Sequence, residues 1–74
     1  MAPQEYLVIL EHAAGSNYSA YVPDLPGCAS TGDTREEVLP NIREAIALHL
    51  EGMREDGDPI PAPSSEADYV DAVP

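Results

Sequence analysis

The sequence predicts an α+β domain in which a small antiparallel sheet is covered on one face by a single helix. Three observations lead to this fold class. Short segments rich in β-forming residues come first, with turn residues between them. One long amphipathic stretch follows them. The chain has 74 residues, which suffices for one domain with one core. We therefore expect a single domain over residues 1–74, with an ordered core at about residues 5–57.

The first two strands are expected to form a hairpin. Residues 7–10 are an apolar run of Leu, Val and Ile, which predicts a strand over residues 5–12. Residues 13–17 contain Gly, Ser and Asn, which suit a hairpin connection. The Tyr-rich segment 18–22 then predicts the second strand. A short connection of this kind makes the two strands antiparallel neighbours.

A proline-rich bend separates the hairpin from the third strand. Pro23 and Pro26 end the second strand because proline donates no hydrogen bond to a sheet. Gly27 can take a positive φ, so residues 23–27 are expected to form an ordered bend. A short third strand is predicted at residues 28–31, before Gly32.

A helix is predicted over residues 35–56. Thr34 followed by Glu37 matches a capping box, in which Glu37 would reach back to the amide of Thr34. Apolar residues then recur at helical spacing up to Met53, and Gly57 is a suitable stop. Pro40 interrupts this pattern because it removes a backbone hydrogen bond. We predict one helix with a kink or irregular first turn there; a helix that begins near Pro40 is the alternative.

The C-terminal part is expected to lack a second helix. Residues 58–65 contain several prolines and predict an extended connector. Residues 66–74 show a weak two-residue alternation, so they could return as an edge strand and complete a β-β-β-α-β order. An untethered acidic tail is the other interpretation of these residues.

The charge limits the kinds of partner. The chain has 14 Asp and Glu residues against three Arg and no Lys, a net charge of −11. Binding to nucleic acid or to anionic lipid relies on clustered cations, so neither is expected. A basic protein is favoured, because complementary charge steers association. All three arginines lie within residues 35–56, which leaves the hairpin, the bend and the C-terminal segment purely acidic.

The sequence also limits the cellular compartment in which the protein is expected. A single cysteine, Cys28, excludes an internal disulfide, and the apolar run 7–10 is too short for a signal peptide or a membrane span. We therefore expect a cytoplasmic protein.

The acids Asp24, Asp33, Glu36 and Glu37 could approach one another and hold Mg²⁺, and His12 or His49 could activate Cys28. Capping, core packing and solvation explain these residues more simply. We expect no cofactor, no metal and no enzyme activity.

Several motifs together resemble the HicB antitoxin family. They are the strand and bend of residues 18–28, which end in Asp-Leu-Pro-Gly-Cys, the Gly-Asp-Thr turn at 32–34, the helix start at 36–38, the helical segment 42–46 and the Gly-Asp-Pro-Ile-Pro connector at 57–61. The resemblance implies a partial ribonuclease-H-like fold without catalytic carboxylates. It also implies binding to HicA, a small basic toxin that cleaves mRNA. This chain resembles a short form without a C-terminal DNA-binding domain, so operon autoregulation is not expected, and Pro40 departs from the uninterrupted helix of the family.

Three functions follow as hypotheses. The first is a type II toxin-antitoxin antitoxin that blocks a basic HicA-like RNase toxin by occlusion. Its candidate contacts, chosen by charge and expected exposure, are Asp24, Asp33, Glu36, Glu37, Glu66, Asp68 and Asp71. The second is a stand-alone homo-oligomeric scaffold in which strand edges and an uncovered apolar face pair between subunits. The third is a Mg²⁺-dependent nuclease that depends on Asp24 and Asp33.

Overall fold

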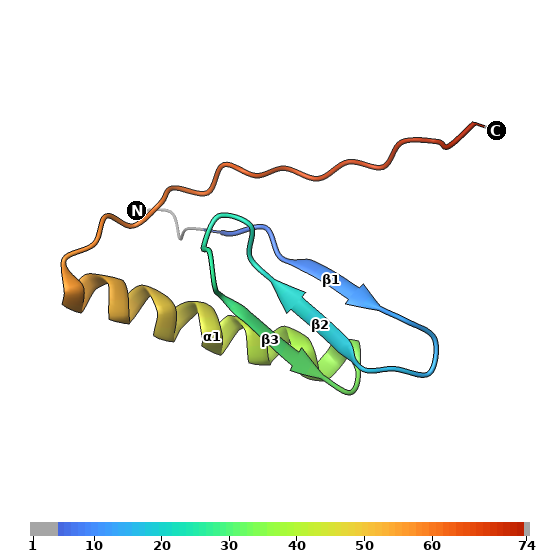
Figure 1. Ribbon diagram of the computed structural model, residues 1–74, viewed down its shortest axis with the longest axis horizontal. Helices are drawn as coiled ribbons and strands as arrows, with labels where there is room; N and C mark the ends of the chain where they lie inside the picture. The colour runs from blue at the N-terminus through green and yellow to red at the C-terminus, as the bar shows by residue number, and fades with distance from the viewer. Residues whose placement is uncertain (1–4, 74) are drawn as a thin grey trace.

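A computed structural model describes residues 5–73, and it shows a three-stranded antiparallel sheet followed by one helix (Figure 1). The elements are β1 (Ile9–His12), β2 (Tyr18–Tyr21), β3 (Ala29–Gly32) and α1 (Arg35–Asp56). The strands lie side by side in the order β1-β2-β3. The predicted α+β class is confirmed. Residues 1–4 and 74 lie outside the described part of the chain, and the ribonuclease-H-like classification stays an expectation from the resemblance.

The hairpin of β1 and β2 forms as predicted, but β1 is shorter than the expected 5–12. Ile9 pairs with Tyr21 and His12 with Tyr18. Beyond Tyr21 the chain turns into the bend, where the Val22 N–H donates to the Cys28 carbonyl at 3.1 Å. Residues 5–8 therefore lie before the paired part of β1, and the sheet pairing of β1 starts at Ile9.

The bend between β2 and β3 turns an apolar side chain into the core. Leu25 N–H donates to the Val22 carbonyl at 3.1 Å, and Cys28 N–H donates to the Leu25 carbonyl at 3.0 Å. Gly27 has a φ of 85°, which side chains with a Cβ rarely adopt. As a result Leu25 is fully buried. The predicted ordered bend is confirmed.

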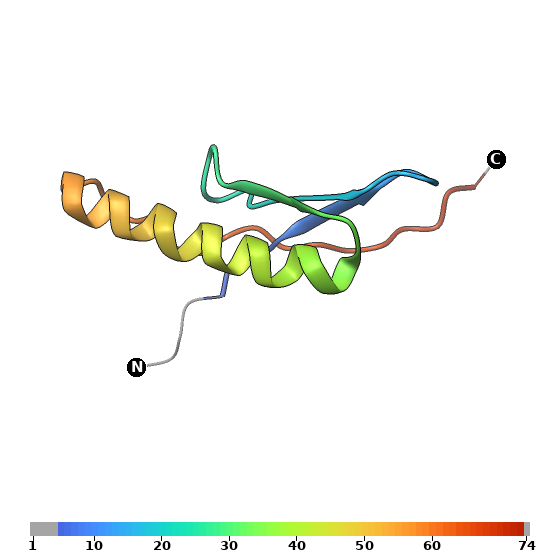
Figure 2. The same cartoon turned by 90° about the horizontal axis from the view of Figure 1, so that it is seen from below.

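The sheet lies over the first half of α1 (Figure 2), and the core is formed between them. Its buried residues are Ala20, Val22, Leu25, Cys28, Val38 and Ile42. Gly32 permits the close approach of the helix start, because a Cβ there would lie 2.6 Å from the backbone nitrogen of Val38. The helix packs directly against β2 and β3, whereas β1 forms an edge of the sheet from which Leu10 packs against the core.

The helix begins at Arg35 and ends at Asp56 without a break at Pro40, so the alternative start near Pro40 is wrong. Thr34 is the N-cap, and its Oγ1 accepts from the Glu37 N–H at 3.2 Å. The carboxylate of Glu37 accepts from the N–H of Asp33 at 3.0 Å, one residue before the amide expected from the capping box. At the other end Gly57 takes a φ of 74° and closes the helix, as predicted.

The C-terminal segment differs from the strand interpretation. Residues 58–73 contain neither helix nor strand, so the predicted edge strand at 66–74 does not form within the described residues. The connector is nevertheless held, because the Tyr6 hydroxyl donates to the Pro61 carbonyl. In Figure 1 the segment runs past the β1 side of the sheet as an extended chain. Within residues 5–73, no helix is long and apolar enough to cross a membrane.

Candidate partner-binding surface

Three of the predicted acidic residues gather where β3 passes into α1. Asp33, Glu36 and Glu37 are all exposed, and we call them the helix-start cluster. Their position follows from the local sequence, because acids are favoured at the positive end of a helix dipole. Glu37 is held by its hydrogen bond to the Asp33 amide, while the other two carboxylates face solvent at the surface. Arg35 lies among these three acids, so the helix start carries a net charge of −2.

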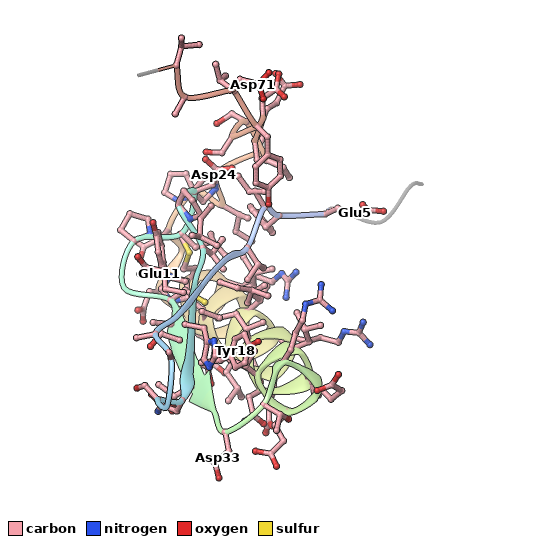
Figure 3. The ribbon with its side chains drawn as sticks, turned by 90° about the vertical axis from the view of Figure 1, so that its right-hand side faces the viewer. Glu5, Glu11, Tyr18, Asp24, Asp33 and Asp71 are labelled. Carbon is pink, nitrogen blue, oxygen red and sulfur yellow. The ribbon has the colours of Figure 1, made fainter. Side chains whose placement is uncertain are left out.

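A pair of stacked rings lies beside this cluster. The rings of His12 and Tyr18 are parallel within 8°, with their centroids 4.1 Å apart. Tyr18 pairs with Gly32, the residue directly before Asp33, so the rings lie at the strand ends from which the helix-start cluster begins. Figure 3 shows Tyr18 and Asp33 in the same lower part of the molecule. We considered His12 only as a partner for Cys28, and did not predict this stack.

Asp24 makes contacts within its own chain that the sequence did not predict, and its predicted partner contact stays a prediction. Its carboxylate accepts hydrogen bonds from Ser64 N–H at 2.9 Å and Oγ at 3.2 Å, and from Ser65 N–H at 3.0 Å and Oγ at 2.7 Å. The Ser64 N–H, followed by the Ser65 hydroxyl and N–H, lowers the pKa of Asp24 from 3.8 to about 2. Asp24 therefore anchors the connector to the bend, and its oxygens are already occupied by this chain.

The remaining predicted acids lie beyond this anchor. Glu66, Asp68 and Asp71 are exposed on residues 66–73, which we call the tail. In Figure 3, which looks along the long axis, Asp24 and Asp71 lie at the top and Asp33 at the bottom, on opposite sides of the molecule. The seven predicted residues are thus divided between two regions. The magnesium and nuclease hypotheses require Asp24 and Asp33 to converge, and this arrangement contradicts that requirement.

The candidate nucleophile is also isolated. Cys28 is 4% exposed, and burial raises the pKa of its thiol. It lies beyond the Tyr21 end of β2, whereas His12 pairs with Tyr18 at the other end. A buried thiol with a raised pKa is a poor nucleophile, because the thiolate is the reactive form. Cys28 serves as a small apolar core residue.

One surface feature was not predicted from the sequence. A groove of about 410 Å³ opens between residues 5–8 and the first half of α1. Its apolar lining includes Val8, Leu39 and Ile46, and Arg43 and Glu5 supply its charged groups. The apolar run before β1 was a signal for it, because these side chains lie beyond the paired part of the sheet. We call this feature the β1–α1 groove.

Comparison with known sequences identifies the family. Residues 6–73 match the family described as HicB_like antitoxin of bacterial toxin-antitoxin system. The chain belongs to this family. The resemblance inferred from the bend, the turn and the helix start is thereby confirmed, and membership of this HicB-like family supports the role of an antitoxin in a toxin-antitoxin system.

Individual relatives agree with this assignment. A UPF0150 protein of Thermoplasma acidophilum is 37% identical over 68 residues, which cover 92% of this chain and 99% of the relative. Antitoxin HicB 1 of Photorhabdus laumondii is 39% identical over 67 residues, which cover 89% of this chain and 43% of the relative. An uncharacterized 14.9 kDa protein of Haemophilus phage HP1 is 45% identical over 53 residues, 72% of this chain and 40% of the relative. This HicB-like chain thus spans less than half of the last two proteins.

Proposed function

We propose that this HicB-like chain is a type II antitoxin that binds a small basic HicA-type toxin, an mRNA-cleaving RNase, and neutralises it by occlusion. Family membership supports the antitoxin role, and the net charge of −11 supports a basic partner. The helix-start cluster is the observation that supports this binding surface. There Asp33 and Glu36 are exposed next to the stacked rings of His12 and Tyr18.

This surface suits a protein that normally holds RNA. Such a protein needs cationic side chains for the phosphates. The carboxylates of Asp33 and Glu36 have the same sign of charge as phosphates, so they would occupy those cations and exclude RNA. A flat aromatic face also attracts Arg and Lys through its π-electrons. Glu66 and Asp68 offer a second acidic contact, whereas Asp24 and Glu37 support the surface by holding their own chain.

Binding to a purified HicA-type toxin tests this proposal. We expect the double variant Asp33→Asn/Glu36→Gln to bind roughly tenfold more weakly, a loss of about 1.4 kcal/mol. Isothermal titration calorimetry at low and high salt should show that the wild type depends more steeply on ionic strength, because screening weakens exposed charge pairs. Inhibition of mRNA cleavage should weaken in parallel.

A matched control removes the same charge elsewhere. Glu51→Gln/Glu55→Gln alters two exposed carboxylates in the second half of α1, far from the helix start. We expect its affinity to stay within twofold of wild type. An equal loss in the control would show that net charge alone matters and would overturn the assignment of the surface. A wild type that neither binds nor inhibits the toxin would overturn the function.

A homo-oligomeric scaffold without a toxin is the second candidate. The uncovered side of β1 and the exposed Leu48 on α1, which is 61% exposed, favour it because apolar surface and strand edges promote association. Sedimentation equilibrium at micromolar concentrations tests it. Stable oligomers without toxin binding would support the scaffold, and a monomer would contradict it.

A further inference from the structure

We propose that the tail of one copy, residues 66–73, adds as a strand beside β1 of a second copy and fills the β1–α1 groove there. The inference rests on the self-association proposed above and does not depend on toxin binding. It names the surface that receives the tail, the segment that inserts, and two residues of opposite charge that would meet in the contact.

The receiving surface begins at the free side of β1. In the order β1-β2-β3, β1 has a strand on one side only within residues 5–73. The helix packs directly against β2 and β3. The unpaired N–H and C=O groups of an edge strand form a template for a strand from another chain.

The β1–α1 groove supplies the side-chain pocket beside this edge. Residues 5–8 run directly into β1, so a strand added along them would lie over the groove. Val8, Leu39 and Ile46 give the groove an apolar lining, and each is only half-buried in the monomer. Arg43 provides its cationic group, and Glu5 provides a carboxylate. A matching occupant is apolar and carries an acid.

The tail has that chemistry. It is extended and carries large apolar side chains in full contact with solvent, with Tyr69 99% exposed and Val73 86% exposed. Side chains two residues apart share one face of a strand, so Ala67, Tyr69, Asp71 and Val73 would point the same way. Three of these four are apolar and one is acidic. This face therefore complements an apolar groove that contains Arg43.

The anchor at Asp24 favours a second copy as the acceptor. Ser64 and Ser65 are fixed on the bend, and from there the tail runs past the β1 side of the sheet and diverges from β1 (Figure 1). Eight extended residues span about 26 Å, which is long enough to follow residues 5–12 of a neighbour. A two-fold arrangement lets each copy donate one tail and accept one, which closes the assembly as a dimer.

Charge reversal across the proposed contact tests the inference in the full chain. We expect Arg43→Asp alone and Asp71→Arg alone each to raise the dimer dissociation constant at least tenfold in sedimentation equilibrium. Mixing the two variants should restore dimers of mixed composition, because each groove then meets a tail of opposite charge. Arg54→Asp and Asp68→Arg make the same charge changes outside the groove and on the other face of the tail, and both should leave the constant unchanged.

Each outcome separates the two proposals. A wild type that stays monomeric overturns self-association and this inference together. If neither charge reversal changes the dimer dissociation constant, self-association stands and the proposed role of the tail is wrong. If Arg43→Asp/Asp71→Arg in one chain restores wild-type behaviour but mixing the single variants does not, the tail closes on its own groove and the second copy is excluded. Toxin binding is not measured, so none of these outcomes affects the antitoxin proposal.

Discussion

Ser65 donates both its N–H and its hydroxyl to the carboxylate of Asp24, at 3.0 and 2.7 Å. Ser64 adds two more hydrogen bonds to the same carboxylate. These contacts join positions 40 and 41 residues apart and fix the point from which the tail leaves the body. Charge-assisted hydrogen bonds of this kind are stronger than neutral ones.

Removal of this carboxylate should release the connector. In Asp24→Ala we expect faster hydrogen exchange at the amides of Ser64 and Ser65, because both lose their acceptor. Hydrogen exchange followed by mass spectrometry measures this directly. Asp33→Ala is the matched control, since it removes an exposed carboxylate that does not contact the connector. Unchanged exchange at Ser64 and Ser65 in Asp24→Ala would contradict the anchor.

The anchor should also depend on pH. Its hydrogen bonds lower the folded-state pKa of Asp24 from 3.8 to about 2. The stabilisation is therefore complete above pH 3.8 and is lost as the pH falls through about 2, because only the carboxylate form accepts all four bonds. We expect the carboxyl carbon of Asp24 to titrate near pH 2 by NMR, and Ser65→Ala to raise that midpoint. A wild-type midpoint of 3.8 would show that the hydrogen bonds do not persist in solution.

Replacing each of two glycines with alanine should change the free energy of unfolding in opposite directions. A Cβ at Gly32 would lie 2.6 Å from the Val38 nitrogen and 2.9 Å from its Cα, so Gly32→Ala must displace the helix start. We expect a loss of about 1–3 kcal/mol in the free energy of unfolding. Gly52 lies within α1 and its Cβ would meet no heavy atom within 4 Å, so Gly52→Ala should gain about 0.5–1 kcal/mol. Urea unfolding measures both, and a stable Gly32→Ala variant would contradict the close packing.

Pro40 should weaken the helix it belongs to. It is exposed, and it leaves the Glu36 carbonyl without the usual donor four residues on. We expect Pro40→Ala to raise the free energy of unfolding by up to about 3 kcal/mol, seen as a higher midpoint of thermal unfolding. Pro59→Ala, in the connector, should produce no such gain. A lower midpoint for Pro40→Ala would mean that the proline ring makes a stabilising contact.

Local signals in the sequence were sufficient for most of the fold. The hairpin turn, the Thr34 cap and the Gly57 stop depend on neighbouring residues, and each element appears near its predicted place. The start of β1 was predicted less well, because it depends on where β2 turns into the bend. The prediction of an edge strand was wrong within residues 66–73, because a weak two-residue alternation does not show whether a sheet edge pairs with the segment.

The candidate surface was predictable only in part. Composition and charge indicated exposed acids, and Asp33 and Glu36 are exposed. The role of Asp24 depends on serines 40 residues away, which no local pattern connects to it. The β1–α1 groove likewise requires knowing that α1 packs directly against β2 and β3 while β1 forms an edge of the sheet.

The helix is longer than the sheet beneath it. Its 22 residues extend about 33 Å, whereas a four-residue strand spans about 13 Å, and its buried residues Val38 and Ile42 both lie in the first half (Figure 1). Cooperative unfolding therefore involves the first half of α1 together with the sheet. The last turns, with fewer buried contacts, can open in local fluctuations while the rest stays folded. A partner that contacts this end can reshape it without disrupting the core.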